Sequence, residues 1–203
     1  MASLPAVYYT PEQYLELERS ADHKSEYYSG QIFSMAGASE AHNIITVNLS
    51  RELSLQLRGR PCRTYSGDMR IRVSATGLYT YPDNAAVCGE RKFDDKHTDT
   101  LTNPNVIIEV LSPSTELYDR GEKFAHYRRL PSLTDYILIS QDKMRIEHYT
   151  RQDETHWLLT EATEPQDEIV LRSIECRLAL SSVYENVEFA APSPINADVT
   201  ARS

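Results

Sequence analysis

Two acidic side chains interrupt apolar stretches of this 203-residue chain and are its strongest candidates for chemistry. Glu109 lies inside the strand-like run Val106–Leu111, and Asp83 follows a tyrosine and a proline. At a period of two residues, Glu109 shares one face of that strand with Ile107 and Leu111. If both faces are covered, a lone carboxylate costs several kcal/mol, about 3–5, unless it is paired or bound to a metal. Acids on neighbouring strands are poor ion-pair partners, but they could share a divalent cation.

A lysine downstream of the strand completes the set. Asp119 and Glu122 have the spacing of a capping box, which predicts a helix running to about residue 130. Phe124 and Tyr127 have core-facing spacing on that helix, and Lys123 lies on the same stripe, four residues before Tyr127. We therefore expect Lys123 to point toward the sheet. The alternative is a lysine whose stem follows the apolar face and whose charge ends in solvent.

Two carboxylates and one ammonium at one sheet edge favour chemistry on a phosphate. Carboxylate oxygens suit Mg²⁺ or a similar hard cation such as Mn²⁺. Such an ion polarises a phosphate and lowers the pKa of a bound water, and an ammonium stabilises the charge that develops. Taken alone, Asp83 is equally well explained as turn chemistry, because Pro-Asp is common in turns.

The composition, 40% hydrophobic and 25% charged, is typical of an ordinary globular protein. It predicts a single domain over residues 1–191 and a disordered tail over 192–203. No run approaches the roughly 20 apolar residues of a membrane helix, and no signal peptide is recognisable, so the expected location is cytoplasmic. The three cysteines fit neither a disulfide framework nor a zinc motif, which predicts buried or idle thiols at Cys62, Cys88 and Cys176.

A formal net charge of −9 argues against a protein that coats nucleic acid through bulk electrostatics. A local basic segment, rich in arginine between residues 51 and 72, nevertheless qualifies as a contact to a DNA backbone. Within it the candidates are Arg58, Arg60 and Arg63. The alternative is a solvated helix end and strand face, the usual explanation of a charge run.

The elements that must position these residues follow a mixed order. Helices are expected over 11–19, where Thr10 is the N-cap, from Ser39 to about Gly59, and from 181. A hairpin is expected over 25–35, with Ser29 and Gly30 in its turn. Further strands are expected over 63–73, 78–88, 105–111, 136–140, 144–150 and 156–160, with a loop over 89–104. This order predicts an α/β (mixed α+β) fold with a central mixed sheet flanked by helices.

Several short stretches together resemble the Uma2 family (DUF820) of the PD-(D/E)XK nuclease superfamily. They are EYYSGQI at 26–32, AHN at 41–43, GDMRI at 67–71, YPD at 81–83, PNVIIEVLSPST at 104–115, DRGEK at 119–123 and LTDY at 133–136. The resemblance extends from about residue 9 to residue 189. As a set these stretches are specific, whereas each one alone would be weak.

The resemblance implies a restriction-endonuclease-like core with an N-terminal helix–hairpin extension and a C-terminal hairpin. It implies that Asp83 and Glu109 are metal ligands, with the carbonyl of Val110 as a third. In the wider superfamily a lysine stands two residues after the glutamate, where this chain has Leu111. The family resemblance implies that Lys123, on the following helix, takes that part.

The resemblance also brings three further residues to the site. Glu26 is expected to assist the metal or the water, and His42 and Asp68 to contact the ligands or the substrate. Each has an ordinary structural alternative: a surface strand position for Glu26, a helix-start histidine for His42, and an ion-paired exposed face for Asp68.

Two functions remain open on these residues. The first is a Mg²⁺-dependent endonuclease that cleaves DNA, with Asp83, Glu109 and Lys123 as catalytic residues. The second is a catalytically inactive nuclease-fold protein that binds nucleic acid or a protein partner, which Leu111 and the acidic balance favour. A third, plainer interpretation is a structural homo-oligomer, because open sheet edges invite pairing. A homodimer is also compatible with either function, because symmetric dimers are the commonest oligomers.

Overall fold

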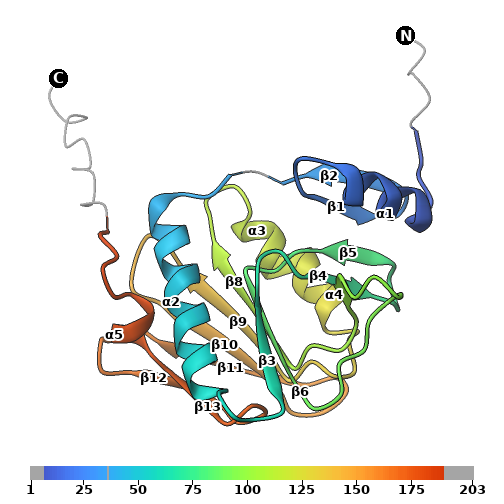
Figure 1. Ribbon diagram of the computed structural model, residues 1–203. Helices are drawn as coiled ribbons and strands as arrows, with labels where there is room; N and C mark the ends of the chain where they lie inside the picture. Colours follow the sequence, from blue (N-terminus) through green and yellow to red (C-terminus); the bar gives the residue numbers. More distant parts are fainter. Residues whose placement is uncertain (1–6, 36, 190–203) are drawn as a thin grey trace, which may run out of the picture.

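A six-stranded mixed sheet forms the centre of the protein in this computed structural model, which describes residues 7–35 and 37–189. Its strand order is β11-β10-β9-β8-β6-β3 (Figure 1). The central strand β8 pairs in parallel with β9 and antiparallel with β6. The strands are β3 (Cys62–Ser66), β6 (Asn84–Cys88), β8 (Val106–Leu111), β9 (Asp135–Ser140), β10 (Ile146–Arg151) and β11 (Trp157–Ala162).

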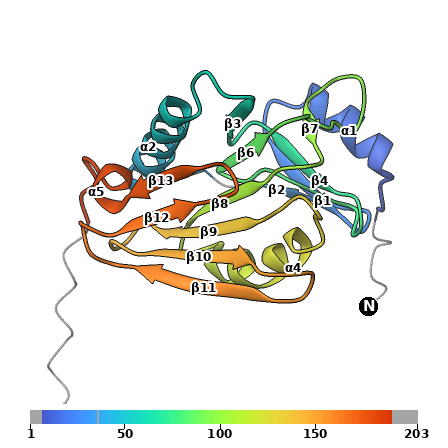
Figure 2. The same ribbon diagram turned by 90° about the horizontal axis from the view of Figure 1, so that it is seen from below.

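Helices cover both faces of this sheet (Figure 2). On one face lie α2 (Glu40–Gln56), α5 (Leu180–Val183) and the hairpin of β12 (Glu168–Leu171) with β13 (Cys176–Ala179). On the other face lies the crossover from β8 to β9, which comprises α3 (Glu116–Tyr118), the π-helical turn η1 (Asp119–Lys123) and α4 (Phe124–Tyr127).

The residues of β8 divide between these two faces as the period-two pattern predicts. Val106, Ile108 and Val110 pack in the core beneath α2, and Ile107 and Leu111 pack in the core beneath the crossover. Glu109, two residues from each of the latter pair, therefore points toward the crossover.

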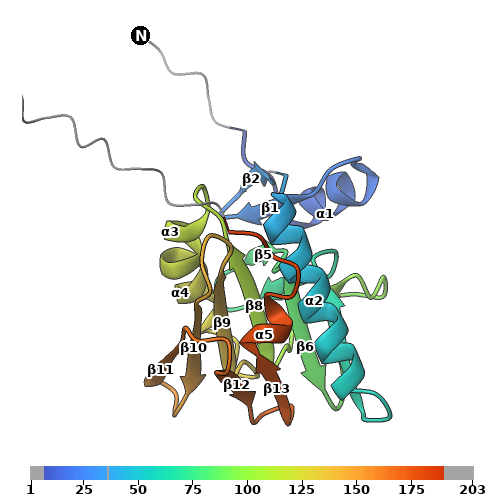
Figure 3. The ribbon, with the colours of Figure 1, turned by 90° about the vertical axis from the view of Figure 1, so that its left-hand side faces the viewer.

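A second, smaller sheet with the order β2-β1-β5-β4-β7 stands beside the crossover (Figures 1 and 3). Its hydrophobic cluster is largely aromatic, with stacked Tyr14 and Tyr27 and the tilted ring of Tyr79. The elements are α1 (Pro11–Ser20), β1 (Ser25–Tyr28), β2 (Gln31–Ser34), β4 (Arg70–Val73), β5 (Leu78–Thr80) and β7 (Thr100–Leu101).

Local sequence signals at the start of the chain are confirmed. Thr10 and Gln13 form the capping box of α1, and the side chain of Ser39 caps α2 by accepting the amide of His42. The hairpin turn contains Ser29 at φ 50° and Gly30 at φ 86°, which is the left-handed backbone that a two-residue hairpin turn requires.

Other boundary predictions were wrong. The expected strands 63–73 and 78–88 each break into two, β3 with β4 and β5 with β6, because a turn at 67–69 and an irregular segment at 81–83 interrupt them. Within the expected loop 89–104 the pair Thr100–Leu101 forms β7. Asp119 and Glu122 do not cap a helix, since helical structure begins at Glu116 and Asp119 lies inside η1.

The expectation of idle thiols was wrong for two of the three cysteines. Cys62 and Cys88 form a disulfide across the β3–β6 pair, because the register places them directly opposite each other. Cys176 is a buried free thiol.

Within residues 7–35 and 37–189, no helix is long and apolar enough to cross a membrane. The tail expected at 192–203 lies outside the described residues.

Packing of α2 on the central sheet can be tested with two leucines of the same helix. Leu49 is fully buried against the sheet, whereas Leu55 is 51% exposed. We expect Leu49→Ala to lower the free energy of unfolding by about 2–5 kcal/mol, because it leaves a cavity. Leu55→Ala should change it by less than about 0.5 kcal/mol, as an exposed substitution. Urea unfolding measures both, and equal effects would contradict this packing.

Candidate active site

Asp83 lies where the pairing of β6 with β8 ends. The last aligned residues of that ladder are Asn84 and Ile108. Beyond them the carboxylate Oδ2 of Asp83 accepts the backbone N–H of Val110 at 2.7 Å. The Asp83 carboxylate thus accepts the hydrogen bond that a backbone carbonyl of a neighbouring strand would otherwise accept. This bond fixes Asp83 against the end of β8.

The same contact orients the carbonyl of Val110. In a β-strand, the N–H and the C=O of one residue point to the same side. Since the N–H of Val110 points to Asp83, its carbonyl oxygen also points toward the open end of the ladder. Asp83 and the Val110 carbonyl therefore present oxygen atoms to one region.

His42 reaches the same region from the first turn of α2. Its Nε2 lies 3.2 Å from Oδ2 of Asp83. The Ser39 hydroxyl that caps the helix also hydrogen-bonds to Gln141, at 2.5 Å, in the β9–β10 turn. This contact anchors the start of α2 to the central sheet and holds His42 beside Asp83.

Glu109 is 3% exposed and has two close partners from the crossover. Its Oε1 accepts the hydroxyl of Tyr127 at 2.9 Å and lies 3.0 Å from Nζ of Lys123. The lysine is itself only 5% exposed, so its charge does not end in solvent. A fixed hydroxyl and a fixed ammonium together hold the orientation of the Glu109 carboxylate.

Two further acids surround the ammonium of Lys123. Glu26 on β1 lies 3.4 Å away and is held by a hydrogen bond from the Thr80 hydroxyl on β5. Asp119 lies 3.5 Å away on the same turn as the lysine. Both residues lie in the π-helical turn η1, and such turns are frequent at functional sites.

The charges of this cluster are not balanced. Burial raises the pKa of Glu109 well above its usual value despite the opposing Lys123, and Asp119 and Asp83 raise it further. Burial likewise raises the pKa of Asp119. Burial alone would lower the pKa of Lys123, but Glu109, Glu26 and Asp119 outweigh it and hold that pKa well above normal. The lysine is therefore charged, and the acids lack sufficient positive charge nearby.

A hard divalent cation fits this donor set. The available atoms are carboxylate and carbonyl oxygens, which Mg²⁺ prefers, and a cation would supply the missing positive charge. In the described part of the chain, no group of three or more His, Cys, Asp and Glu side chains forms a metal cage. Mg²⁺ does not require one, because it is commonly bound by one or two carboxylates together with waters and substrate phosphates.

Four candidate residues lie outside the cluster. Asp68 has a side chain that is 89% exposed and pairs with Lys24 in solvent. Arg58 is exposed, Arg60 pairs with Glu175, and Arg63 donates to a neighbouring carbonyl. These arginines gather beyond the C-terminal end of α2, which lies about 21 Å along the helix from His42 at 1.5 Å per residue.

Sequence reasoning missed three residues that the structure brings to the cluster. Asp119 was interpreted as a helix cap, although it stands four residues before Lys123 and eight before Tyr127, on one stripe. Tyr127 was assigned to the core, and its hydroxyl binds Glu109. Thr80, which holds Glu26, carries no signal in the sequence, because β1 and β5 meet only in the folded sheet.

Comparisons with known proteins agree with this architecture. The Uma2 family, described as "Putative restriction endonuclease", matches residues 11–181. Two uncharacterised proteins of Synechocystis sp. are similar. Slr1290 is 38% identical over 92% of this chain and 97% of its own length. Sll1609 is 41% identical over 79% of this chain and 90% of its own.

A solved structure from Anabaena variabilis, described as a "putative nuclease belonging to DUF820", superposes with a TM-score of 0.70. It covers 85% of this chain and 96% of its own, at 18% sequence identity. At that identity the similarity shows the fold.

The raised pKa values of Glu109 and Asp119 predict how stability changes with pH. Below the unfolded carboxyl pKa of about 4, both acids are protonated in the folded and the unfolded state, and their burial costs no stability. As the pH rises from there through the folded pKa, stability is lost. We expect the metal-free protein to become less stable as the pH rises above about 4, and Glu109→Gln to reduce this loss.

Urea titrations across that pH range measure the effect. Glu154→Gln, at an exposed turn position, is the matched control and should follow the wild type. Identical pH profiles for Glu109→Gln and the wild type would show that Glu109 is not destabilised by its surroundings.

Proposed function

This chain belongs to the Uma2 family, and we propose that it is a Mg²⁺-dependent endonuclease that hydrolyses phosphodiester bonds of DNA. The observation that carries the proposal is the buried pair of Glu109 and Lys123 next to the half-buried Asp83, which is bonded to the strand residue after Glu109. A buried acid–lysine group with strongly perturbed pKa values, at the end of a central strand, is typical of a functional site.

In the proposed reaction Asp83, Glu109 and the Val110 carbonyl would hold the metal. When bound, Mg²⁺ polarises the phosphate and makes a bound water more acidic. His42 and the Val110 amide fix Asp83, and the Tyr127 hydroxyl fixes Glu109, so that the carboxylates need not reorganise as substrate binds.

Lys123 supplies the positive charge for the phosphate as its negative charge increases in the transition state. A preorganised cation in a buried site stabilises such charge far better than one in water. Glu26 and Asp119 keep the ammonium protonated and aimed. Leu111, although at the superfamily's usual lysine position, lines the apolar core of the same face, which leaves this task to Lys123.

We further propose that the protein acts as a homodimer, which suits cleavage of a duplex. The outer strands β2 and β11 of the two sheets offer edges for pairing. The second candidate function, an inactive nuclease-fold protein that binds nucleic acid or a protein partner, rests on Leu111. The experiments below separate the two functions.

Removal of either metal-binding carboxylate should abolish cleavage. We expect Asp83→Asn and Glu109→Gln each to lower the rate of plasmid cleavage in Mg²⁺ or Mn²⁺ by on the order of 10²–10³-fold or more. Asp68→Asn, outside the cluster, should cleave at the wild-type rate. Absence of cleavage by the wild type on DNA in either metal would favour the binding-only alternative.

Lys123→Met tests the role of the relocated lysine. Single-turnover cleavage at saturating DNA should slow by on the order of 10²–10³-fold, because the developing charge loses its buried cation. Calorimetry with Mn²⁺ should still detect binding, since the oxygen ligands remain. Cleavage at the wild-type rate would show that Lys123 serves only to neutralise the surrounding acids.

A further inference from the structure

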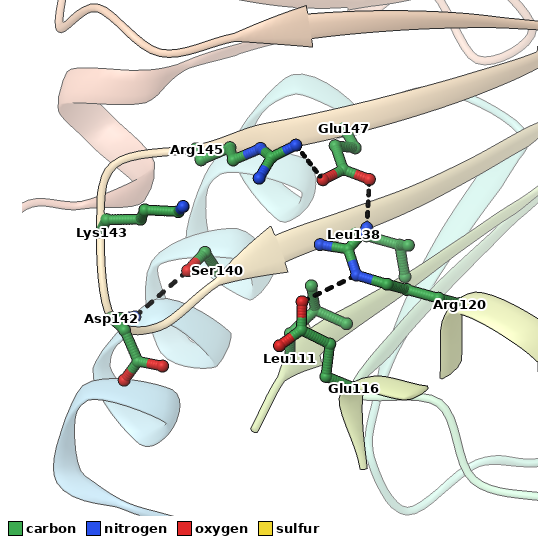
Figure 4. A pocket seen from close by; sticks show the side chains of 9 residues that line it. All are labelled: Leu111, Glu116, Arg120, Leu138, Ser140, Asp142, Lys143, Arg145 and Glu147. Carbon is green, nitrogen blue, oxygen red and sulfur yellow. Dashed lines mark hydrogen bonds and ion pairs between the residues drawn. The ribbon is translucent and has the colours of Figure 1, made fainter. Parts of the chain in front are cut away.

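A cavity of about 220 Å³ lies on the crossover face of the central sheet, close to Glu109. Figure 4 shows the side chains that line it. Leu138, which lines it, stands directly opposite Glu109 in the β8–β9 register and opposite Glu147 in the β9–β10 register. Neighbouring strands are about 4.8 Å apart, so the cavity begins one strand from Glu109. Leu111 forms another part of its wall.

Two arginines of this cavity are held in place by a buried acid. Glu147 is 3% exposed. It accepts a hydrogen bond from Nη1 of Arg120, and its Oε1 lies 2.9 Å from Nη2 of Arg145. The Nε atoms donate to Glu116 at 2.8 Å and to Glu161, respectively. Fixing both guanidinium groups in advance lowers the entropic cost of binding an anion.

Each arginine retains one uncommitted donor. Among contacts with the described residues, neither Nη2 of Arg120 nor Nη1 of Arg145 has a partner. Lys143, in the β9–β10 turn, forms no ion pair with any of those residues either. Its side chain extends toward the cavity, whereas the carboxylate of Asp142 points away (Figure 4). The wall therefore offers an ammonium and two guanidinium NH2 groups.

We propose that this cavity binds a backbone phosphate of the nucleic-acid strand next to the phosphodiester that is cleaved. The inference rests on the proposed function, because it takes the Glu109 cluster as the place of cleavage. Arginine forks and lysine are the side chains that bind phosphate. Arg120 directly follows Asp119 in η1, so one helical turn carries both an acid of the cleavage site and a cation of this cavity.

Lys143→Ala provides the test, because this exposed side chain has no structural partner to lose. Binding of a labelled DNA duplex is measured in the non-cleaving Glu109→Gln background. Lys143→Ala should weaken binding by on the order of fivefold and reduce the slope of log K against log salt by about 1. Lys92→Ala, which removes an exposed lysine from the 89–104 loop, is the matched control and should bind normally.

Cleavage assays separate this inference from the proposed function. With Glu109 intact, Lys143→Ala should lower the rate at subsaturating DNA and leave the single-turnover rate at saturation unchanged. If Lys143→Ala binds and cleaves like the wild type, this inference is wrong and the nuclease proposal stands. If Arg63→Ala weakens binding and Lys143→Ala does not, the DNA contact lies beyond α2, and the inference is again overturned.

An experiment with inorganic phosphate tests whether the cavity binds a free phosphate ion rather than a phosphate of a DNA strand. Suppose that phosphate raises the melting temperature of the wild type but not of Lys143→Ala, while no DNA binding is detected. The cavity would then take a free phosphate, which would overturn the inference about the strand. Competition between phosphate and bound DNA, lost in Lys143→Ala, would support it.

Discussion

The ammonium of Lys123 contacts carboxylates from three separate parts of the chain, and the geometry of the site depends on this contact. Glu26 comes from the smaller sheet, Glu109 from the central sheet and Asp119 from the crossover that connects β8 to β9. Without the cation, three acids would repel one another in an interior where burial already disfavours their charged forms. The lysine thus links the two sheets electrostatically at the position of the proposed metal site.

Much of this site follows from periodicity, which the sequence displays directly. A period of two places Glu109 on the crossover face of β8, and helical spacing places Lys123 on the stripe of Phe124 and Tyr127. Both orientations hold because the faces of a strand and of a helix are fixed by local geometry. The same reasoning did not identify Asp119, because its spacing to Glu122 also fits a capping box at the start of a helix. The structure excludes the cap, since the helix already begins at Glu116.

Contacts between distant segments could not be predicted in this way. The disulfide depends on the register of β3 against β6. The two cysteines are 26 residues apart, and the periodicity of the sequence does not predict a register between such distant segments. The arginines of 58–63 are close in sequence to His42, yet the length of α2 separates them from it. Asp68 likewise lies in a motif shared with the family, and its carboxylate faces solvent. Family motifs thus mark segments of the fold, and the direction of each side chain is decided by packing.

The position of the lysine on the crossover has a consequence for the control of activity. Had it stood at Leu111, the acid and the cation would share one strand and would remain neighbours in any state that keeps β8. Here the cation is carried by short turns, α3, η1 and α4, whose packing can open without unfolding the sheet. A nascent or partly opened chain would keep Asp83 and Glu109 in place but lose the ammonium of Lys123 together with Asp119. In the nuclease proposed above, hydrolysis of DNA would therefore require complete docking of the crossover, and a partly folded molecule would not cut.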